Sequence, residues 1–304
     1  MKLVPSYTKV LALGSSYTEE ALTGHVILQE KVDGSQFGFG LNEDGNVVCR
    51  SHNAPLDLEG HNNMFQEGTD YINSIQDRIK EYPKDTYFYA EYLQKPKHNT
   101  LKYEVTPKNH IVLFDMMING RWADRDQLVQ TANHLGIDVI PELYRGIADV
   151  EKIKSLLETP SYLGNEIIEG VVIKNYDQTI MLGGHIFPLF TKYVREGFKE
   201  RHSADWKVRQ PKGALAEFVD GFKSEARWNK AIIHAKEMGV LTQSPKDIGN
   251  LIQLIQKDIV EEEEENIKRH LYKCFKDDIL RKSVSGFPEW YKDQLLKIYQ
   301  TNEK

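Results

Sequence analysis

The sequence predicts an α+β protein in which a mainly antiparallel sheet domain, residues 1–205, is followed by a small all-helical domain, residues 206–304. Before residue 205, short apolar runs alternate with turns that contain Gly and Asn. After it, apolar residues recur at helical spacing. The 304 residues, 40% of them hydrophobic, are enough for one large core and one smaller core.

Several strands are predicted in the first domain. "FGFGLNEDGNVVCRS" indicates a hairpin that turns at Asp44-Gly45, and Asn119-Gly120 indicates a second, because both dipeptides adopt the positive φ that tight hairpins need. Further strands are predicted over 86–93, 110–120 and 169–176. Helical spacing between them predicts two helices, one with Ile72, Ile75, Ile79 and Tyr82 and one with Ile153, Leu156 and Leu157.

The second domain carries the start and stop signals of helices. Ser244 followed by Pro245 predicts an N-cap with Pro at the first helical position, and apolar residues then recur from Ile248 to Ile259. Gly286 predicts a stop before a last helix. The acidic run "EEEEE" at 261–265 fits a solvated helix face.

Composition limits the class of protein. No apolar run approaches the about 20 residues that span a bilayer, so we expect a cytoplasmic, unprocessed protein with no membrane partner and no obligate protein partner. Cys49 and Cys274 lie far apart and are expected to be buried thiols.

The net charge of −6 argues mildly against a nucleic-acid partner. However, residues 192–212 hold seven Lys or Arg and three Asp or Glu, which fits either a solvated surface or a platform for a phosphate backbone.

Charged side chains interrupt the predicted strands, and a lysine precedes an Asp-Gly pair in "EKVDG". Each of them alone fits a surface strand. Together they suggest a cleft lined by cations and carboxylates, as a nucleoside triphosphate with a divalent metal requires. The residues are Lys31, Arg50, Glu91, Glu169, Lys174 and Lys192.

Six short segments occur in the order of the covalent nucleotidyltransferase motifs I, Ia, III, IIIa, IV and V. They are KVDG (31–34), CRSHN (49–53), FYAEY (88–92), LFDMM (113–117), EGVVIK (169–174) and FTKYV (190–194). With "EKVDGS" and the spacing, the chain most resembles the ATP-dependent RNA ligase 2 family, by motif over roughly residues 25 to 202. The resemblance implies an ATP-grasp-like ligase domain with ATP as co-substrate and Mg²⁺ or Mn²⁺ as metal. It also implies the joining of RNA 3′-OH and 5′-phosphate ends, with sealing of nicked or duplex RNA in RNA repair.

A lysine amine with a pKa near 10.4 is deprotonated in only about one molecule in a thousand at neutral pH, so Lys31 needs help to act as a nucleophile. Partial burial, Lys174, Lys192 and a bound cation would lower its pKa. Lys31 would then attack the α-phosphorus of ATP, expel pyrophosphate and carry AMP. Gly34 would let the backbone pass close to the nucleotide, and Asp33 would orient or help deprotonate the amine.

The resemblance implies further roles, residue by residue. Glu30 would contact the base, Phe114 would stack on it, and Glu91 would accept hydrogen bonds from the ribose. Arg50 would bind the ribose or the nucleic-acid end, and Glu169 the metal. Lys174 and Lys192 would neutralise the α-phosphate and the leaving group.

One position departs from the family pattern. Motif V usually reads K-x-K, and the second lysine is Val194 here. Either Arg195 compensates for it or the phosphate contact is weaker.

Other functions are weighed against this one. A DNA ligase or a GTP-dependent capping guanylyltransferase would place an OB-fold after motif V, where this chain has predicted helices. A catalytically inactive nucleotide- or RNA-binding module would not need the amine of Lys31, nor Glu91 and Glu169.

Overall fold

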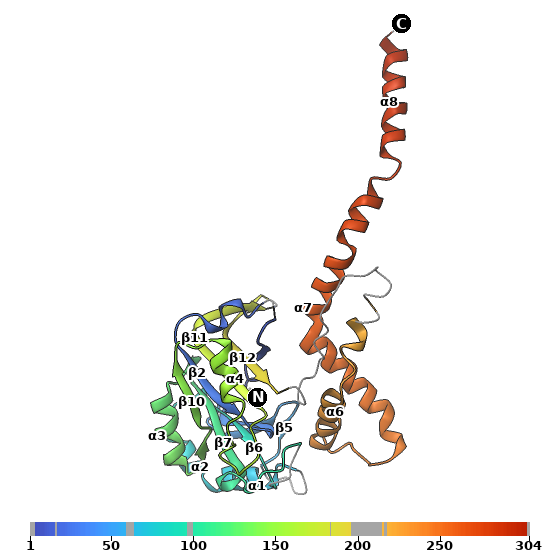
Figure 1. Ribbon diagram of the computed structural model, residues 1–304. Helices are drawn as coiled ribbons and strands as arrows, with labels where there is room; N and C mark the ends of the chain where they lie inside the picture. Colours follow the sequence, from blue (N-terminus) through green and yellow to red (C-terminus); the bar gives the residue numbers. More distant parts are fainter. Residues whose placement is uncertain are drawn as a thin grey trace. The chain divides into compact units, whose positions relative to one another are not determined.

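Two β-sheets organise the part of the chain that precedes residue 195 (Figure 1). The computed structural model describes residues 4–15, 17–58, 64–95, 100–182, 184–195, 215 and 218–302. The chain divides into two units, Met1–Glu200 with Ser224–Gln256, and Arg201–Lys223 with Lys257–Lys304. The domain boundary predicted at residue 205 lies outside the described residues.

The first sheet has five strands in the order β1-β12-β11-β2-β10. All neighbours are antiparallel except β1, which runs parallel to β12. Because β2 and β11 are antiparallel neighbours, the sheet sets the end of β2 beside the start of β11. The strands are β1 (Leu11–Ala12), β2 (Val26–Lys31), β10 (Glu142–Gly146), β11 (Gly170–Leu182) and β12 (His185–Val194).

The second sheet has seven strands in the order β5-β4-β3-β6-β7-β8, and β9 pairs with β7. Both predicted hairpins are confirmed: Gly45 has φ 82° between β3 and β4, and Asn119 and Gly120 have φ 50° and 75° between β7 and β8. The strands are β3 (Ser35–Leu41), β4 (Val47–Ser51), β5 (Pro55–Leu56), β6 (Thr86–Tyr92), β7 (Ile111–Ile118), β8 (Arg121–Trp122) and β9 (Asp138–Val139).

Helices cover the outer face of each sheet. On the second sheet, α1 (Gln66–Ser74), α2 (Gln76–Ile79) and α3 (Arg125–Leu135) bury apolar side chains against β3, β6 and β7. On the first sheet, Ile153 of α4 (Val150–Leu156) packs with Leu28 and Val171. The helix predicted around Ile153 is confirmed, whereas the one predicted from Ile72 to Tyr82 is divided at Ile75 into α1 and α2 and ends at Ile79.

The opposite faces, called the inner faces below, lie against each other. The ring of Tyr7 joins them, since its centroid lies 5.0 Å from that of Tyr89 on β6 and 6.1 Å from that of Phe190 on β12. Cys49 is buried as expected, whereas Cys274 is partly exposed. The chemistry-bearing side chains of both sheets therefore share one interior.

The described chain beyond residue 218 is mainly helical. Its elements are α6 (Glu225–Glu237), the 3-10 turn Pro245–Asp247, α7 (Ile248–Ser283) and α8 (Phe287–Asn302). The predicted start at Ser244 is confirmed, because its hydroxyl and Asp247 form a capping box with Pro245 at the first turn. Gly286, with φ 82°, separates α7 from α8. None of the described helices is long and apolar enough to cross a membrane.

Candidate active site

Lys31 ends β2 and forms an ion pair with Glu169, the residue that precedes β11. The Lys31 Nζ lies 2.7 Å from each carboxylate oxygen of Glu169. The sheet register explains the pair, because Lys31 lies directly opposite Gly170. A Cβ on Gly170 would approach the carbonyl oxygen of Tyr193 to 2.5 Å, so these strands leave room only for glycine. Burial raises the pKa of Glu169, and the charges of Lys31 and Lys192 oppose that rise.

The register also shows which cations share the inner face with Lys31. Directly opposite residues of antiparallel strands lie on one face, and alternate residues along a strand return to it. Val172 pairs with Gln29 and with Lys192, and Lys174 pairs with Ile27. Lys31, Lys174 and Lys192 therefore lie on the same face of the first sheet.

Glu91 of β6 is brought to this ion pair from the second sheet. Its Oε2 is buried and has no hydrogen-bond partner among the described residues. Burial raises the pKa of Glu91 to about 8, although the charge of Lys31 lowers it. Gly34 is required here, because a Cβ at that position would lie 2.7 Å from Leu93 Cδ1 and 3.1 Å from Glu91 Oε2.

Asp33 is held by the chain segment that follows β6. Its Oδ2 accepts a hydrogen bond of 2.7 Å from the backbone N of Leu101, and its own backbone N donates to the Tyr103 hydroxyl at 2.7 Å. These bonds fix the turn after Lys31. The predicted role of Asp33 in orienting or deprotonating the amine remains a prediction.

Arg50 of β4 donates its guanidinium hydrogens to backbone carbonyls. Nε contacts Ser51, Nη1 contacts Val4 and Nη2 contacts His52, each at 2.9 Å. Burial lowers the pKa of Arg50. Arg50 lies opposite Gly38, which also pairs with Tyr89, and so it faces the same interior as Tyr89.

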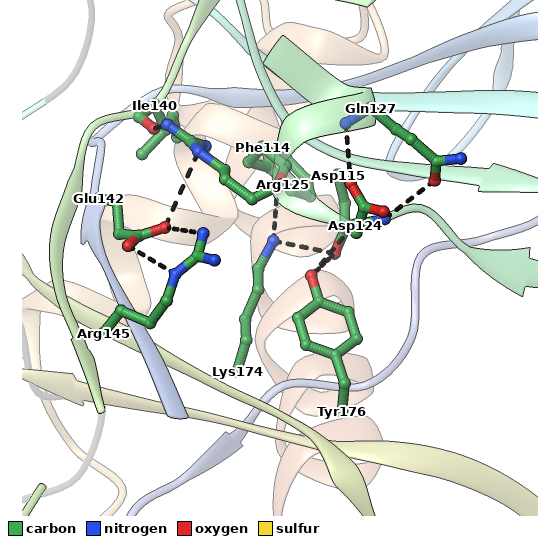
Figure 2. Close-up of polar contacts among 10 residues, drawn as sticks. All are labelled: Phe114, Asp115, Asp124, Arg125, Gln127, Ile140, Glu142, Arg145, Lys174 and Tyr176. Carbon is green, nitrogen blue, oxygen red and sulfur yellow. Dashed lines mark hydrogen bonds and ion pairs between the residues drawn. The ribbon is translucent and has the colours of Figure 1, made fainter. Parts of the chain in front are cut away.

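Lys174 is held by β7 of the facing sheet, as Figure 2 shows. Its Nζ donates to Asp115 Oδ2 at 2.8 Å and to the carbonyl oxygen of Phe114 at 2.5 Å. On β2 and β11, its row lies four residues from that of Lys31, or about 13 Å along the strands. The sequence-based expectation that Lys174 acts directly on the pKa of Lys31 is not supported by this geometry.

Glu30 points away from Lys31, as adjacent strand residues do. Its buried carboxylate accepts hydrogen bonds from the Ser161 hydroxyl at 2.5 Å and the backbone N of Tyr162 at 3.2 Å. It therefore anchors the loop before β11. Phe114, expected to stack on the base, is partly buried and packs against Tyr7, Val112 and their neighbours.

Val194 and Arg195 lie at the end of β12. Val194 pairs with Gly170, so it occupies the same row of the inner face as Lys31. The guanidinium of Arg195 donates to the carbonyl of Ile167 at 3.4 Å, and its backbone N donates to the carbonyl of Glu169 at 2.9 Å. These contacts hold the chain around Glu169 and give no support to compensation by Arg195.

The structure thus joins Lys31, Glu91 and Glu169, and holds Lys174 with Asp115. Asp115 and Tyr7, which contact each other at 2.7 Å, were not among the sequence-based site residues. Asp115 follows Phe114 in "LFDMM", a signal that could have found it, whereas nothing marked Tyr7. The basic stretch beyond Arg195 lies outside the described residues.

The residues fit a divalent cation that also binds substrate oxygens. Among the described residues, no cluster of three or more His, Cys, Asp or Glu side chains is arranged to hold a metal ion. Mg²⁺ usually binds one or two carboxylates together with substrate phosphates and water. Glu169 and the unpaired Oε2 of Glu91 offer oxygen ligands of this kind.

Comparison with known proteins gives one family match. The family model described as RNA ligase matches residues 24–193, more than half of the chain. No curated protein sequence matches.

Solved structures of Naegleria gruberi RNA ligase are similar at low identity. The form with PPi has 16% identity and a TM-score of 0.48, and a mutant with ATP and Mn has the same values. In both, the match covers 63% of this chain and 57% of that chain. A mutant with AMP and Mn has 16% identity, a TM-score of 0.48, and coverage of 64% and 57%. The chain therefore matches somewhat more than half the length of these proteins.

Proposed function

The chain belongs to the RNA ligase family, and from this premise we propose that it is an ATP-dependent RNA ligase that joins 3′-OH and 5′-phosphate ends through a lysyl-AMP intermediate. The observation that carries the proposal is the pair of Lys31 and Glu169 at 2.7 Å, which lies within the matched residues. A lysine with 27% of its side chain exposed, beside a nearly buried carboxylate, has the access and the local charge expected of a nucleophile.

The first step would form a P–N bond between Lys31 Nζ and the α-phosphorus of ATP, with pyrophosphate as the leaving group. Before the attack, Nζ would pass a proton to the Glu169 carboxylate, which lies 2.7 Å away, and leave its pair with it. Gly34 supports this step, because it keeps the backbone beside Glu91 free of a side chain. Lys192, on the same face as Lys31, would meet phosphate oxygens there.

Two further transfers would complete the reaction. A 5′-phosphate oxygen of the RNA would attack the phosphorus of lysyl-AMP and release Lys31, giving an adenylylated RNA end. The 3′-OH would then attack the 5′-phosphorus, form the phosphodiester and release AMP. A bound divalent cation would supply charge neutralisation for the phosphate oxygens, and Glu169 and Glu91 are the side chains that would hold it. We propose nicked or duplex RNA as the substrate and RNA repair as the role.

Covalent self-adenylylation tests the proposal. Purified protein incubated with ATP and Mg²⁺ or Mn²⁺ should gain the mass of one AMP, and Lys31→Ala should gain none. GTP in the same assay separates this activity from that of a capping guanylyltransferase, and a nicked RNA duplex compared with a nicked DNA duplex separates it from a DNA ligase. Labelling of Lys31→Ala at the wild-type level would refute the lysyl-AMP mechanism, and the absence of labelling in the wild type would favour an inactive binding module.

A further inference from the structure

The first turn of α8 carries three aromatic side chains that contact one another and remain about half exposed. Phe287, Trp290 and Tyr291 have exposed fractions of 56%, 56% and 49%. The ring centroid of Phe287 lies 5.9 Å from that of Trp290 and 5.8 Å from that of Tyr291. A single exposed apolar side chain is ordinary, whereas grouped aromatic rings mark a binding surface. These three residues are called the aromatic cluster below.

The second half of α7 presents one more exposed ring, and cations surround it. Residues three and four apart lie on the same face of a helix, so Tyr272 shares a face with Arg269, Lys273 and Lys276. The Tyr272 residue is 66% exposed, and the Nζ of Lys276 lies 5.7 Å from the centroid of its ring. The three cations are exposed as well. These four residues are called the basic row below.

The charge of α7 is divided along its length. Residues 257–265 hold one Lys against one Asp and five Glu, whereas residues 268–282 hold six Lys or Arg against two Asp. The second segment therefore has a net charge of +4 in a chain whose net charge is −6. Lys273 and Lys276 form no ion pair with another described residue. The basic row thus keeps positive charge available for a partner that is an anion.

A single strand of RNA has the chemistry that both features require. Its phosphates attract cations, and its unpaired bases stack on aromatic side chains whatever their sequence. The bases of a duplex are already stacked and present only their edges. An apolar helix of another protein would match the aromatic cluster, but it would leave the charge of the basic row uncompensated. The combination therefore favours an anionic chain with aromatic bases.

We propose that the basic row and the aromatic cluster bind unpaired RNA that continues from the ends to be joined. The inference rests on the proposed function in one respect, because it takes the RNA to be the substrate of the ligase. It extends that substrate from nicked or duplex RNA to ends with single-stranded extensions. Lys273 and Lys276 contact phosphates, and the rings of Tyr272 and Trp290 stack on bases. None of these residues touches the reacting atoms.

Binding without ATP or metal tests the stacking. The probe is a fluorescein-labelled single-stranded RNA of about 12 nucleotides, a length within the usual range of such sites. Trp290→Ala in the full-length protein should raise the Kd about tenfold, as expected for the loss of one base–aromatic stack. Trp228→Ala is the matched control, because Trp228 of α6 is 46% exposed, and its Kd should stay within about twofold. Equal Kd values for the wild type and Trp290→Ala would overturn the proposal.

Two measurements on the wild type do not depend on how a variant folds. An abasic strand of the same length should bind at least about tenfold more weakly than the RNA, because it offers phosphates without bases. The RNA should also quench part of the tryptophan emission, and that part should be missing in Trp290→Phe, which keeps an aromatic ring. Equal affinity for the abasic strand would show that charge alone holds the RNA and would overturn the stacking.

The salt dependence of affinity tests the basic row. Replacing Lys273 and Lys276 with Gln should flatten the log–log slope of affinity against salt by about 0.7 for each cation, the value for single strands. Lys154→Gln is the control, because Lys154 pairs with Glu151 on α4, and its slope should equal that of the wild type. An unchanged slope in the double variant would overturn the role of the row.

Sealing assays separate this inference from the proposed function. A nicked duplex with a single-stranded extension should have a lower KM than the same duplex without it, and Trp290→Ala should abolish the difference while self-adenylylation stays unchanged. A wild type that seals both substrates with one KM, and binds the single strand no better than Trp290→Ala does, would overturn this inference alone. A wild type that never gains AMP would overturn the proposed function, and the binding measurements would still decide whether unpaired RNA is bound.

The oligomeric state tests a different occupant of the aromatic cluster. Light scattering of the protein without RNA should give the mass of one chain. A dimer that Trp290→Ala dissociates and that the RNA probe does not displace would show that the rings pair with a second copy, and would overturn the proposal.

Discussion

Lys31 Nζ lies 2.7 Å from both carboxylate oxygens of Glu169, although 138 residues separate them in the sequence. This ion pair occupies both oxygens of the carboxylate that would hold the divalent cation. A cation bound at Glu169 would compete for the same oxygens. Metal binding and release of the nucleophile are therefore expected to be linked.

Glu169→Gln should reduce self-adenylylation about a hundredfold or more, because it removes the charge that would hold the cation while keeping the shape of the side chain. The measurement is the rate over a Mn²⁺ titration. Glu151→Gln is the matched control, since Glu151 pairs with Lys154 on the exposed face of α4. Equal rates for the two variants would mean that Glu169 is only a partner for Lys31.

Gly34→Ala should lower both the melting temperature and the rate of adenylylation. The added methyl would meet Leu93 Cδ1 at 2.7 Å and Glu91 Oε2 at 3.1 Å, so the turn after Lys31 must shift. Gly249→Ala is the control, because nothing lies within 4 Å of a Cβ there and alanine favours a helix by about 1 kcal/mol. A Gly34→Ala protein with wild-type rate would show that this close approach is not needed.

Glu91 should make the protein, measured without ATP or metal, less stable as pH rises. Burial raises its pKa from 4.5 to about 8, so the folded state binds the proton more tightly than the unfolded state. The stability from this proton is complete below pH 4.5 and is lost as pH rises toward 8. Glu91→Gln should unfold like the wild type near pH 4.5 and be more stable by several kcal/mol at pH 8.5, since each pKa unit corresponds to about 1.4 kcal/mol. Urea unfolding at both pH values tests this, and a difference that does not change with pH would contradict it.

Val194→Lys should speed adenylylation severalfold. Val194 shares a row of the inner face with Gly170 and Lys31, so a lysine there would add a cation for the phosphate oxygens of ATP. Arg195→Gln should change the rate much less, because its guanidinium donates to the Ile167 carbonyl. Single-turnover rates with ATP compare the two. A large loss in Arg195→Gln with no gain in Val194→Lys would show that Arg195 compensates.

The elements of the sheets could be predicted because they depend on local signals. Asp44-Gly45 and Asn119-Gly120 turn where positive φ is needed, and Ser244 with Pro245 starts a helix. The face of the sheet on which Glu30 lies could also have been predicted, since adjacent residues of a strand point to opposite faces. Local patterns therefore give the elements and the orientation of their side chains.

The partners across the sheets could not be predicted in the same way. The position of Lys174 depends on Asp115, which belongs to the other sheet, and on Tyr7 from a segment without a motif. A charged residue in a strand does not reveal which distant residue will neutralise it. Sequence reasoning therefore placed Lys174 beside Lys31, whereas the register sets their rows four residues apart.

The basic stretch after motif V should bind RNA without taking part in the adenylylation of Lys31. Replacing Arg201, Lys207 and Arg209 with Gln in the full-length protein should weaken binding to a nicked RNA duplex and slow its sealing. The attachment of AMP should stay within about twofold of the wild type, since that step involves ATP, the metal and the residues around Lys31.

If all three side chains neutralise phosphates, the log–log slope of affinity against salt should flatten by about 0.9 for each cation removed. Binding measured from about 50 to 300 mM salt, beside adenylylation and sealing rates, tests this with Lys257→Gln as a control on the exposed surface of α7. An unchanged salt slope would show that the stretch is only a solvated surface, and equal losses of adenylylation and sealing would show that it supports the fold of the catalytic residues.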